Sequence, residues 1–581
     1  MAAPTASAAI YYKAEEFDPT KRMMGRQVAS EAFLRAVARY DPSSELHVYA
    51  ARPEETQVFA RVIAAMNDSG APAAQARQAR WVRHGDIAGL AKAGCLYRPD
   101  PVLHDEAWLR RFGDPRAYSL TGVTHTISSA GAQKALAQYL TAPYEAWDAV
   151  ICTSEAVRRA VAHLLAENAD YLAERLGMAA PPAARLRLPV IPLGVHTDQF
   201  DTTTSAMRAA RERRRHALGI APDDVVALFV GRLAFHAKAN PYPMYVALEA
   251  AAKRCGRKVH LVQAGWFGTP HIESAFKDGA AKLCPSVTCH FLDGRDASVR
   301  AEVWAMGDLF TSLVDNVQET FGLAPVEAMA AGLPVVAADW DGYRETVRDG
   351  VDGFLIATTQ TPPGFGEAMA QRHLAGVDSY DMYIAGAALN AAVDIGAAAD
   401  AYAALIDNAD LRRRMTLAGR RRAHDTFEWR RIYAMYRELW GELAAIRAAA
   451  PSPASRAAGR SVNPLHPDPF RMFGHYPTYT YGARSRVRAA DSRDAAAWAA
   501  TLEHPLLRAG ETVMPRQEEI AAVRAALALA ADGMSVAELL ERAAAPGRRD
   551  ALVRGLAWFL KAGLIAIDDR IAVPDRPPPL E

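Results

Sequence analysis

With 581 residues, 50% of them hydrophobic, the chain predicts two large domains and an additional smaller piece, because single cores stop growing at roughly 250–300 residues. A formal net charge of +1 argues against a general nucleic-acid binder, whose affinity depends on a basic surface. The five cysteines include no Cys-x-x-Cys pair, which indicates neither a disulfide framework nor a structural zinc site.

The N-terminal residues lack the basic-then-apolar order of a secretory signal peptide, and no apolar run reaches the roughly 18 residues of a membrane span. The cysteine usage fits a reducing compartment. We therefore expect a cytoplasmic protein whose contact with the inner face of a membrane is at most peripheral.

Short apolar runs alternate with helical stretches from the start of the chain. This alternation predicts a parallel sheet covered by helices, in an α/β domain that we place at residues 1–205. The runs are AIYY near residue 10, ELHVYA at 45–50, YSLTGVTHTI at 118–127, WDAVICTS at 147–154 and LPVIPLGV at 188–195.

Several positions at predicted strand ends of this domain are candidates for ligand contact. Gly25 and Arg26 open the helix after the first strand, where a glycine permits close approach of a ligand and an arginine can meet an anion. A plain turn with a solvated arginine explains them equally well. His125 lies at the carboxyl end of a strand, although a lone histidine there is more often structural. Thr153 and Ser154 are predicted to cap the next helix.

A second α/β domain is predicted at 206–425. Its basic first stretch, MRAARERRRHALGI at 207–220, predicts a helix with a solvated face, or alternatively a binding patch. The apolar strand DVVALFV at 224–230 is followed by Arg232 and Lys238. An arginine fork and a lysine point charge are the cations that a diphosphate needs, although taken alone they are ordinary surface cations.

Further strands of this domain are predicted from KVHLVQAGW at 258–266, VTCHFLDG at 287–294 and GDLFTSLV at 307–314. Gly265 lies at the end of the first of these runs. A glycine at that point lets a nucleotide base approach closely, or simply forms a turn.

The stretch QETFGLAPVEAMAAGLPVVAA at 318–338 predicts a loop, a helix, a turn and a buried strand. Pro325 suits the first helical turn and Gly332 the left-handed position after the last one. A helix N-terminus presents unpaired N–H groups, so residues 320–323 can hold phosphate or sugar oxygens. Glu319 in the loop and Glu327 on the helix would accept hydrogen bonds from sugar hydroxyls, whereas an isolated pair would be solvated surface charges.

This stretch resembles the donor-site signature of the retaining glycosyltransferases of family 4, which have two facing Rossmann-like domains in the GT-B arrangement. The resemblance implies that Glu327 binds the donor ribose and that Glu319 contacts hydroxyls of the donor sugar. It also implies that the loop of Thr320, Phe321, Gly322 and Leu323 offers backbone groups to the donor.

The same resemblance extends to earlier parts of the chain and covers roughly three quarters of it. It implies that Arg232 and Lys238 meet the donor diphosphate and that His125 contacts the donor sugar. The loop with Gly25 and Arg26 would face the donor and acceptor, although the paired glycines usual in the family are absent there.

A second acidic pattern, Asp339-Trp340-Asp341, has the Asp-x-Asp spacing that holds a divalent metal in the other large glycosyltransferase fold. The resemblance here is to metal-independent enzymes, and the two cations after the 224–230 strand already supply positive charge. We therefore expect no metal and no cofactor, with a nucleotide-sugar as substrate.

Residues 358–400, which contain two prolines and several glycines, are predicted to be an insertion at the domain edge. The helical stretch that follows carries an aromatic stripe, which is typical of a core. In the resembling family such a helix crosses back onto the first domain, so we expect a crossing helix at 426–449. The aromatic residues stand at 427, 429, 433, 436 and 440.

The remaining chain is predicted in two parts. Residues 450–510 form a linker and an extended strap rich in Pro, Tyr and Phe, and residues 511–581 resemble a small, mainly helical winged-helix module. Such modules bind nucleic acid through a helix in a groove. Acidic residues and the apolar stretch AWFLKAGLI favour packing or homo-oligomerisation instead, so we expect no nucleic-acid partner.

Together these patterns favour a retaining glycosyltransferase that moves a hexosyl-type sugar from a nucleoside-diphosphate sugar to a hydroxyl of a carbohydrate, lipid-linked or other small acceptor. The alternative is a non-catalytic scaffold that binds a nucleotide-sugar and acts through its C-terminal module. The charged residues at the expected donor site favour the enzyme. The sequence does not specify the donor nucleotide, the sugar or the acceptor.

Overall fold

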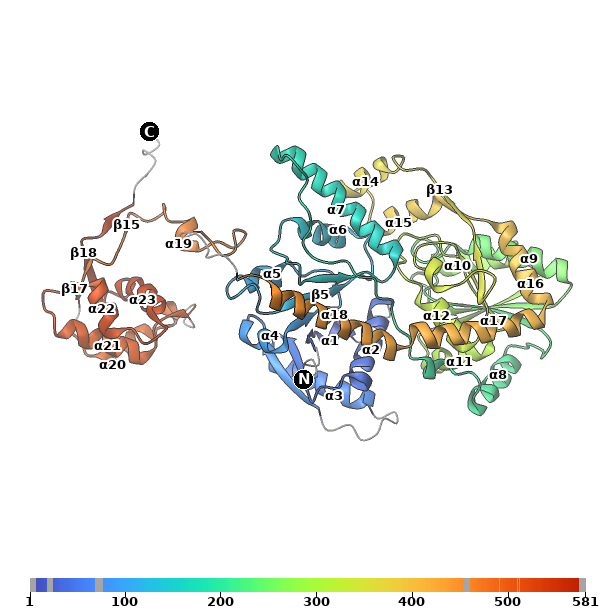
Figure 1. Ribbon diagram of the computed structural model, residues 1–581, viewed down its shortest axis with the longest axis horizontal. Helices are drawn as coiled ribbons and strands as arrows, with labels where there is room; N and C mark the ends of the chain where they lie inside the picture. Colours follow the sequence, from blue (N-terminus) through green and yellow to red (C-terminus); the bar gives the residue numbers. More distant parts are fainter. Residues whose placement is uncertain are drawn as a thin grey trace. The chain divides into compact units, whose positions relative to one another are not determined.

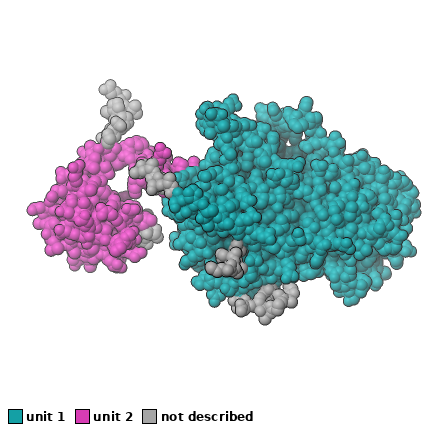
Figure 2. Space-filling view, viewed as in Figure 1, with its two compact units in different colours: residues 1–458 teal, residues 459–581 magenta. Residues whose placement is uncertain are grey.

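The computed structural model describes residues 7–17, 25–67, 77–452, 460–490, 492–508, 510 and 513–573. The chain divides into two compact units, residues 1–458 and 459–581, shown along the sequence in Figure 1 and by unit in Figure 2. None of the described helices is both long enough and apolar enough to span a bilayer.

The first domain of the first unit contains a parallel sheet with helices against it. Neighbouring strand residues such as Ala9 and Ile10 belong to different core clusters, so each face of the sheet has its own core. The strands are β1 (Ala9–Tyr11), β2 (Glu45–Ala50), β3 (Gln78–Arg83), β4 (Cys95–Tyr97), β5 (Ser119–Val123) and β6 (Ala149–Ile151), and the helices are α1 (Ala14–Phe17), α2 (Gly25–Tyr40), α3 (Pro53–Asn67), α4 (Ile87–Ala93), α5 (His104–Arg110), α6 (Ala130–Ala137) and α7 (Glu155–Leu176).

The second domain repeats this architecture. Its strands are β7 (Val225–Val230), β8 (Val259–Gly265), β9 (Val287–Asp293), β10 (Leu309–Ser312), β11 (Val335–Ala338) and β12 (Gly353–Ile356). Its helices are α8 (Ser205–Ala217), α9 (Pro241–Cys255), α10 (Pro270–Leu283), α11 (Ala297–Met306), α12 (Leu323–Ala331), α13 (Tyr343–Thr346), α16 (Ile395–Asp407) and α17 (Ala409–Arg422).

Both sheets have six strands, in the orders β3-β2-β1-β4-β5-β6 and β12-β11-β10-β7-β8-β9. Every pairing within them is parallel. Numbered from its own first strand, each sheet has the order 3-2-1-4-5-6 of a Rossmann fold. The predicted pair of Rossmann-like α/β domains is therefore confirmed.

The aromatic stripe at the end of the first unit is buried, as its helical spacing predicts. It lies on a π-helical turn (Ala423–Phe427) and on α18 (Trp429–Ala449), which packs against α2 and β5 of the first domain, where Figure 1 shows it in orange. Trp429, Tyr433 and Tyr436 share one core cluster with Phe33 of α2. The helix thereby returns the chain to the first domain.

The predicted insertion contains a small antiparallel sheet and two helices. Its elements are β13 (Thr358–Gln360), α14 (Glu367–Leu374), α15 (Tyr380–Leu389) and β14 (Ala391–Val393), with β13 paired to β14. Ile384 of α15 is fully buried against Ala234 and Ala237 of the loop after β7. The insertion therefore covers that loop.

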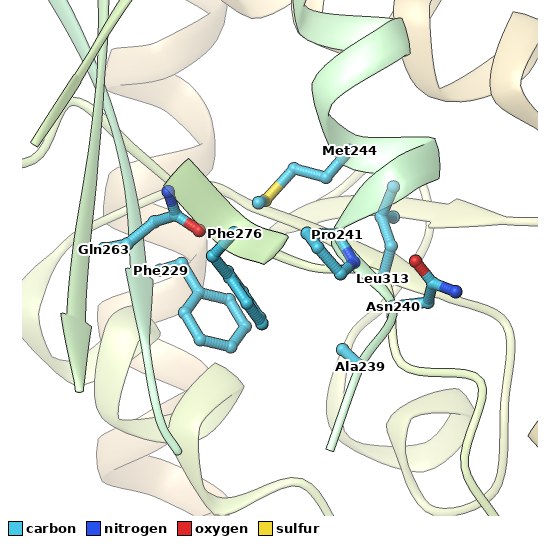
Figure 3. Close-up of a pocket in the computed structure, with 8 residues that line it drawn as sticks. All are labelled: Phe229, Ala239, Asn240, Pro241, Met244, Gln263, Phe276 and Leu313. Atoms are coloured by element: carbon cyan, nitrogen blue, oxygen red, sulfur yellow. The ribbon is translucent and has the colours of Figure 1, made fainter. Parts of the chain in front are cut away.

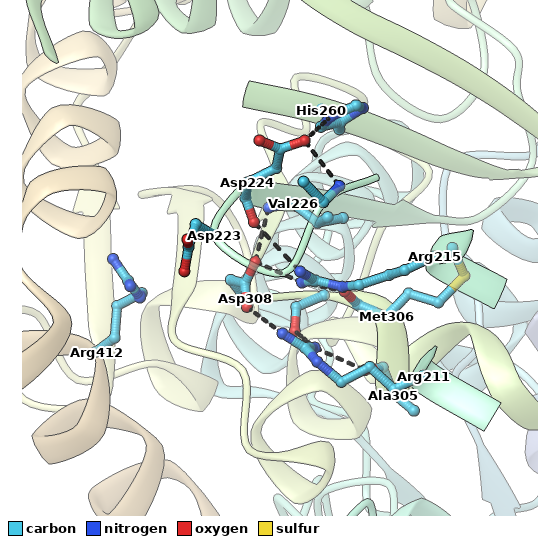
Figure 4. Close-up of polar contacts among 12 residues, drawn as sticks. Arg211, Arg215, Asp223, Asp224, Val226, His260, Ala305, Met306, Asp308 and Arg412 are labelled. Atoms are coloured by element: carbon cyan, nitrogen blue, oxygen red, sulfur yellow. Dashed lines mark hydrogen bonds and ion pairs between the residues drawn. The ribbon is translucent and has the colours of Figure 1, made fainter. Parts of the chain in front are cut away.

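The basic helix α8 has the predicted solvated face, on which Arg208 and Arg213 are exposed. Two other arginines, Arg211 and Arg215, turn inward and anchor the helix to the domain (Figure 4). Arg211 donates to the carbonyl O of Ala305 at 2.8 Å and to Asp308 Oδ1 at 2.6 Å, and Arg215 donates to Met306 O at 2.7 Å and to Asp308 Oδ2 at 2.6 Å. These arginines satisfy carbonyl groups at the end of α11, which a helix leaves unpaired.

The other arginines of α8 are also engaged. Arg213 and Arg214 both donate to Glu302 at 2.7 Å, and Arg208 donates to Thr203 O at 2.6 Å. The alternative of a free basic binding patch on this helix loses its support, because its cations already have partners.

The second unit combines the two predicted parts of the tail. Strands β15 and β16, from the part predicted as linker and strap, pair with β19 and with β17 and β18 of the predicted module, so the two parts form one unit. The likeness to a winged helix stays a prediction. The strands are β15 (Tyr479–Thr480), β16 (Arg486–Ala489), β17 (Met534–Ser535), β18 (Ile565–Asp568) and β19 (Ile571–Ala572), and the helices are α19 (Pro469–Met472), α20 (Ala495–Leu502), α21 (Gln517–Ala528), α22 (Val536–Ala543) and α23 (Arg549–Lys561).

Because Arg215 is buried and Arg213 is exposed, we expect the loss of each side chain to affect the stability of the first unit to a different extent. We expect Arg215→Ala to destabilise the first unit by about 3 kcal/mol, since it leaves the buried side of Asp308 without its cation. Arg213→Ala, on the same helix, removes a guanidinium that is 59% exposed and should cost less than about 1 kcal/mol. Thermal unfolding of both variants measures the difference, and equal melting temperatures would contradict the anchoring role.

Candidate functional site

The strand order of the second sheet reverses between β7 and β10, and ligands of such sheets bind beyond the carboxyl ends of the strands at this point. The loop after β7 carries Arg232 and Lys238, and the loop after β10 carries Glu319. Arg232 Nη2 donates to Ala237 O and to Gln318 Oε1, both at 3.2 Å. The arginine thus ties together the two loops that flank the reversal.

Lys238 and Glu319 form a half-buried ion pair in which Nζ donates to Oε2. Burial disfavours the charged form of each group, but the attraction between the two charges is stronger than this penalty. The pKa of Lys238 is therefore raised above its usual range, and the pKa of Glu319 is lowered below its usual range. Glu319 also accepts from the backbone N–H groups of Thr320, at 3.4 Å, and Gly322. The anion site predicted at this helix N-terminus is therefore filled by the protein's own carboxylate.

The loop before α12 has little freedom to change shape. Gly322 has a φ of +94°, and a Cβ there would lie 2.3 Å from the Tyr343 ring, so only glycine fits. Phe321 is buried and packs edge-on against Phe427 with ring centroids 5.9 Å apart. Leu323 begins the helix, which ends at the left-handed Gly332 as predicted.

Glu327 lies on the second turn of α12. Burial raises the pKa of its carboxyl to about 7, and Lys238 opposes the shift. It is half-buried, and no described group forms a hydrogen bond with it. A carboxylate in this state has its oxygens available to the hydroxyls of a ligand.

The first domain touches the same loop. Thr320 Oγ1 donates to the carbonyl O of His125 at 2.9 Å, and Ser154 Oγ donates to Thr320 O at 2.7 Å. Ser154 also caps α7 by accepting from Val157 N at 3.2 Å, as predicted. Thr153, predicted to cap as well, lies one residue too early to reach that N–H, and its buried Oγ1 has no hydrogen-bond partner among the described residues.

A further contact between the domains was not predicted. Tyr380 of the insertion lies with its hydroxyl 2.7 Å from Ser128 Oγ of the first domain, and it accepts from Gln318 Nε2 at 3.0 Å. Burial lowers the pKa of Arg232, while the neighbouring Asp381 and Tyr380 oppose this shift. The sequence offered no way to place this helix beside the site.

Three other candidate residues have different surroundings. A Cβ on Gly265 would lie 2.0 Å from the carbonyl O of Gly231, so packing of the loop after β7 already requires this glycine. A Cβ on Gly25, at the start of α2, would meet nothing within 4 Å. The side chain of Arg26 lies outside the described part of the chain. Contact of these three with a donor stays a prediction.

A small hollow lies beside the N-terminus of α9 rather than at Glu319 (Figure 3). Its volume of about 10 Å³ holds about one water molecule. Its lining is mostly apolar and consists of Phe229, Ala239, Asn240, Pro241, Met244, Gln263, Phe276 and Leu313. It is too small to receive a nucleotide-sugar.

The two aspartates of the Asp-x-Asp pattern have separate environments. Asp339 forms an ion pair with Arg344 at 2.9 Å, and Asp341 accepts from the backbone N–H of Tyr343 at 3.3 Å. Across the residues that the structure describes, no three His, Cys, Asp or Glu side chains are grouped so as to hold a metal ion.

Comparison with solved structures finds similar chains at low identity. The Anabaena protein HepE, solved in complex with UDP, is 17% identical and aligns with a TM-score of 0.47 over 75% of this chain and 100% of its own. A glycosyltransferase of Rickettsia africae is 14% identical, with a TM-score of 0.45 over 76% of this chain and 99% of its own.

Sequence comparison places the chain in a family. Residues 210–371 match the family model described as glycosyl transferases group 1. A D-inositol 3-phosphate glycosyltransferase of Geodermatophilus obscurus is 36% identical over 199 residues, which are 33% of this chain and 40% of that protein. The protein of the same name from Actinosynnema mirum is 31% identical over 360 residues, which are 55% of this chain and 83% of that protein. The chain therefore belongs to the group 1 glycosyl transferases.

Proposed function

We propose that the protein is a retaining glycosyltransferase that transfers a hexosyl group from a nucleoside-diphosphate sugar to a hydroxyl acceptor. The observation that carries this proposal is the convergence of Arg232, Lys238, Glu319 and Glu327 at the strand reversal of the second sheet. These groups match what the two ends of such a donor require: cations for the diphosphate and acceptors for hydroxyls.

Departure of the nucleoside diphosphate places negative charge on its terminal phosphate. In this proposal Arg232 and Lys238 stabilise that charge, because preorganised groups aimed at developing charge give the largest catalytic effects. Lys238 is paired with Glu319 before the donor binds. Donor binding would let the lysine turn toward phosphate and free Glu319 to accept from sugar hydroxyls.

Glu327 is assigned to the ribose of the donor. Its half-buried carboxyl forms no hydrogen bond with the described residues, which suits a role in accepting from two neighbouring hydroxyls. His125 is assigned to the sugar, since its carbonyl is bonded to Thr320 of the donor loop. Retention of configuration comes from the resemblance to family 4, in which the acceptor attacks the same face of the sugar that the leaving group occupied.

The acceptor is proposed only by chemical class. The two relatives above are named for D-inositol 3-phosphate, which makes a phosphorylated polyol the first acceptor to test, beside glycans and lipid-linked hydroxyls.

Thermal-shift screening of the full chain against UDP, GDP, ADP and their glucose, mannose and N-acetylglucosamine esters tests donor binding, since a ligand of the native state raises the melting temperature. Product analysis with acceptors of each class then tests transfer. A donor that binds tightly but is never turned over would instead indicate a nucleotide-sugar-binding scaffold. The absence of any stabilising diphosphate would refute both.

Leaving-group stabilisation and donor binding are expected to depend on different residues. Arg232→Ala should lower kcat by about 100-fold or more, because the charge that it meets grows only as the bond breaks. Glu327→Ala should raise the donor KM by about 10-fold or more, because its hydroxyl contacts are shared by ground and transition states. Steady-state kinetics decide between them, and an Arg232→Ala enzyme with raised KM but intact kcat would contradict the assignment.

Chelation should leave activity unchanged. Arg232 and Lys238 meet the phosphate charge in this proposal, so Asp339 and Asp341 have no metal to hold. Initial rates with and without EDTA measure this. A large loss that magnesium or manganese restores would overturn the prediction.

The raised pKa of Glu327 predicts a stability effect that depends on pH. Between its unfolded value near 4.5 and about 7, the native state binds a proton that the unfolded state lacks, so native stability falls as pH rises through this window. Glu327→Gln should therefore stabilise the ligand-free protein at pH 8 by at least about 1 kcal/mol, and the gain should vanish near pH 4.5. Melting temperatures across this range measure it, and a gain independent of pH would be inconsistent with titration of Glu327.

A further inference from the structure

The turn after β11 contains an aspartate in a backbone conformation that favours glycine. Asp341 has a φ of +40°, and Asp569 is the other non-glycine residue with a positive φ in the described part of the chain. Holding a non-glycine residue in such a region costs of order 1–3 kcal/mol, and such strain gathers at functional sites.

The packing of this turn keeps it in place. A Cβ on Gly342 would lie 2.6 Å from Phe321 Cα and 2.7 Å from the carbonyl O of Thr320. Trp340 Nε1 donates to the carbonyl O of Asn316 at 3.2 Å. The turn is thus pressed against the loop that carries Glu319, and Asp341 cannot move away from the donor site without breaking these contacts.

The carboxyl of Asp341 is only half satisfied by the protein. Oδ1 accepts from Tyr343 N at 3.3 Å, whereas Oδ2 is buried and has no hydrogen-bond partner among the described residues. An unpaired buried polar atom costs roughly 1–3 kcal/mol. Neither the strain nor the unpaired oxygen contributes to the fold, because glycine would form the same turn without either.

The charges around this carboxyl define what it can bind. Burial and the neighbouring Glu319 raise the pKa of Asp341 well above its usual range, and Lys238 opposes this shift. An aspartate shifted in this direction holds its proton to higher pH than usual, and in its protonated form it can both donate and accept a hydrogen bond. A sugar hydroxyl matches that pair of capacities, whereas a uronic acid would bring a second carboxylate beside Glu319.

We propose that Asp341 is a specificity residue for the donor sugar, with its unpaired Oδ2 forming a hydrogen bond to a hydroxyl of a neutral hexose held next to Glu319. This inference rests on the proposed function and deepens it. It assigns Asp341 to the sugar and not to the diphosphate, which belongs to Arg232 and Lys238.

The test compares Asp341→Gly, which relieves the backbone strain and removes the carboxyl, with Asp341→Asn, which keeps its size and its ability to donate and accept. Calorimetric titrations measure the binding of two ligands to each variant: the nucleoside diphosphate and the corresponding nucleotide-sugar (the hexose ester) that bind best in the thermal-shift screen. Melting temperatures of the free variants show that each is folded, and that of Asp341→Gly should equal or exceed the wild-type value.

We expect Asp341→Gly to bind the free diphosphate within about twofold of wild type and the hexose ester about 10-fold more weakly, with Asp341→Asn in between. Deoxy analogues of the ester identify the hydroxyl: removal of that group should weaken wild-type binding but not binding to Asp341→Gly. If Asp341→Gly bound the diphosphate and the hexose ester equally more weakly than wild type, or bound both as tightly as wild type, the assignment would be overturned. Failure of wild type to bind any diphosphate would refute the proposed function, and this assignment with it.

Discussion

A half-buried lysine keeps its charge in this protein because a single carboxylate lies against it. The Lys238–Glu319 pair joins the loops after β7 and β10 and binds the N–H groups that open α12. Breaking such a pair without a substitute leaves a partly buried charge unpaired, which is unfavourable. A ligand that separates the pair would have to bring both an anion for the lysine and hydrogen-bond donors for the carboxylate. Under the proposed function those are the two ends of a nucleoside-diphosphate sugar, and neither end alone replaces the whole pair.

The contact between the domains lies at the same place. Thr320 bonds to the carbonyl of His125 and accepts from Ser154, and Tyr380 reaches Ser128 from the insertion. Glu345 of α13 accepts from the N–H groups of Glu155 and Ala156 at the start of α7. Because these bonds involve Thr320 and the segments that pack against it, the relative position of the two domains and the shape of the loop before α12 are physically linked.

Local chemistry in the sequence accounts for what could be predicted. Alternating apolar runs gave the two α/β domains, and Pro325 and Gly332 bounded α12 because their backbone preferences are local. The motif resemblance singled out Arg232 and Glu319, which the structure places on the two loops that flank the strand reversal. Contacts between distant segments could not be predicted: the pairing of Lys238 with Glu319, the inward turn of Arg215 and the approach of Tyr380 depend on packing that no local pattern encodes. The solvated face of the basic helix was predicted but its two inward arginines were not, because charge along a helix does not show which carbonyls its arginines will meet.

The pairing within the second unit affects how that unit can form during synthesis. Strand β16 lies between β17 and β18, and β15 pairs with β19, so residues near 480 depend on residues near 570. These are non-local pairings, which are slow to form. The ribosome must release almost the whole chain before β15 and β16 gain these partners. Until then the strands have unpaired edges of the kind that invite aggregation, while the first unit, whose segments are complete by residue 449, can already fold.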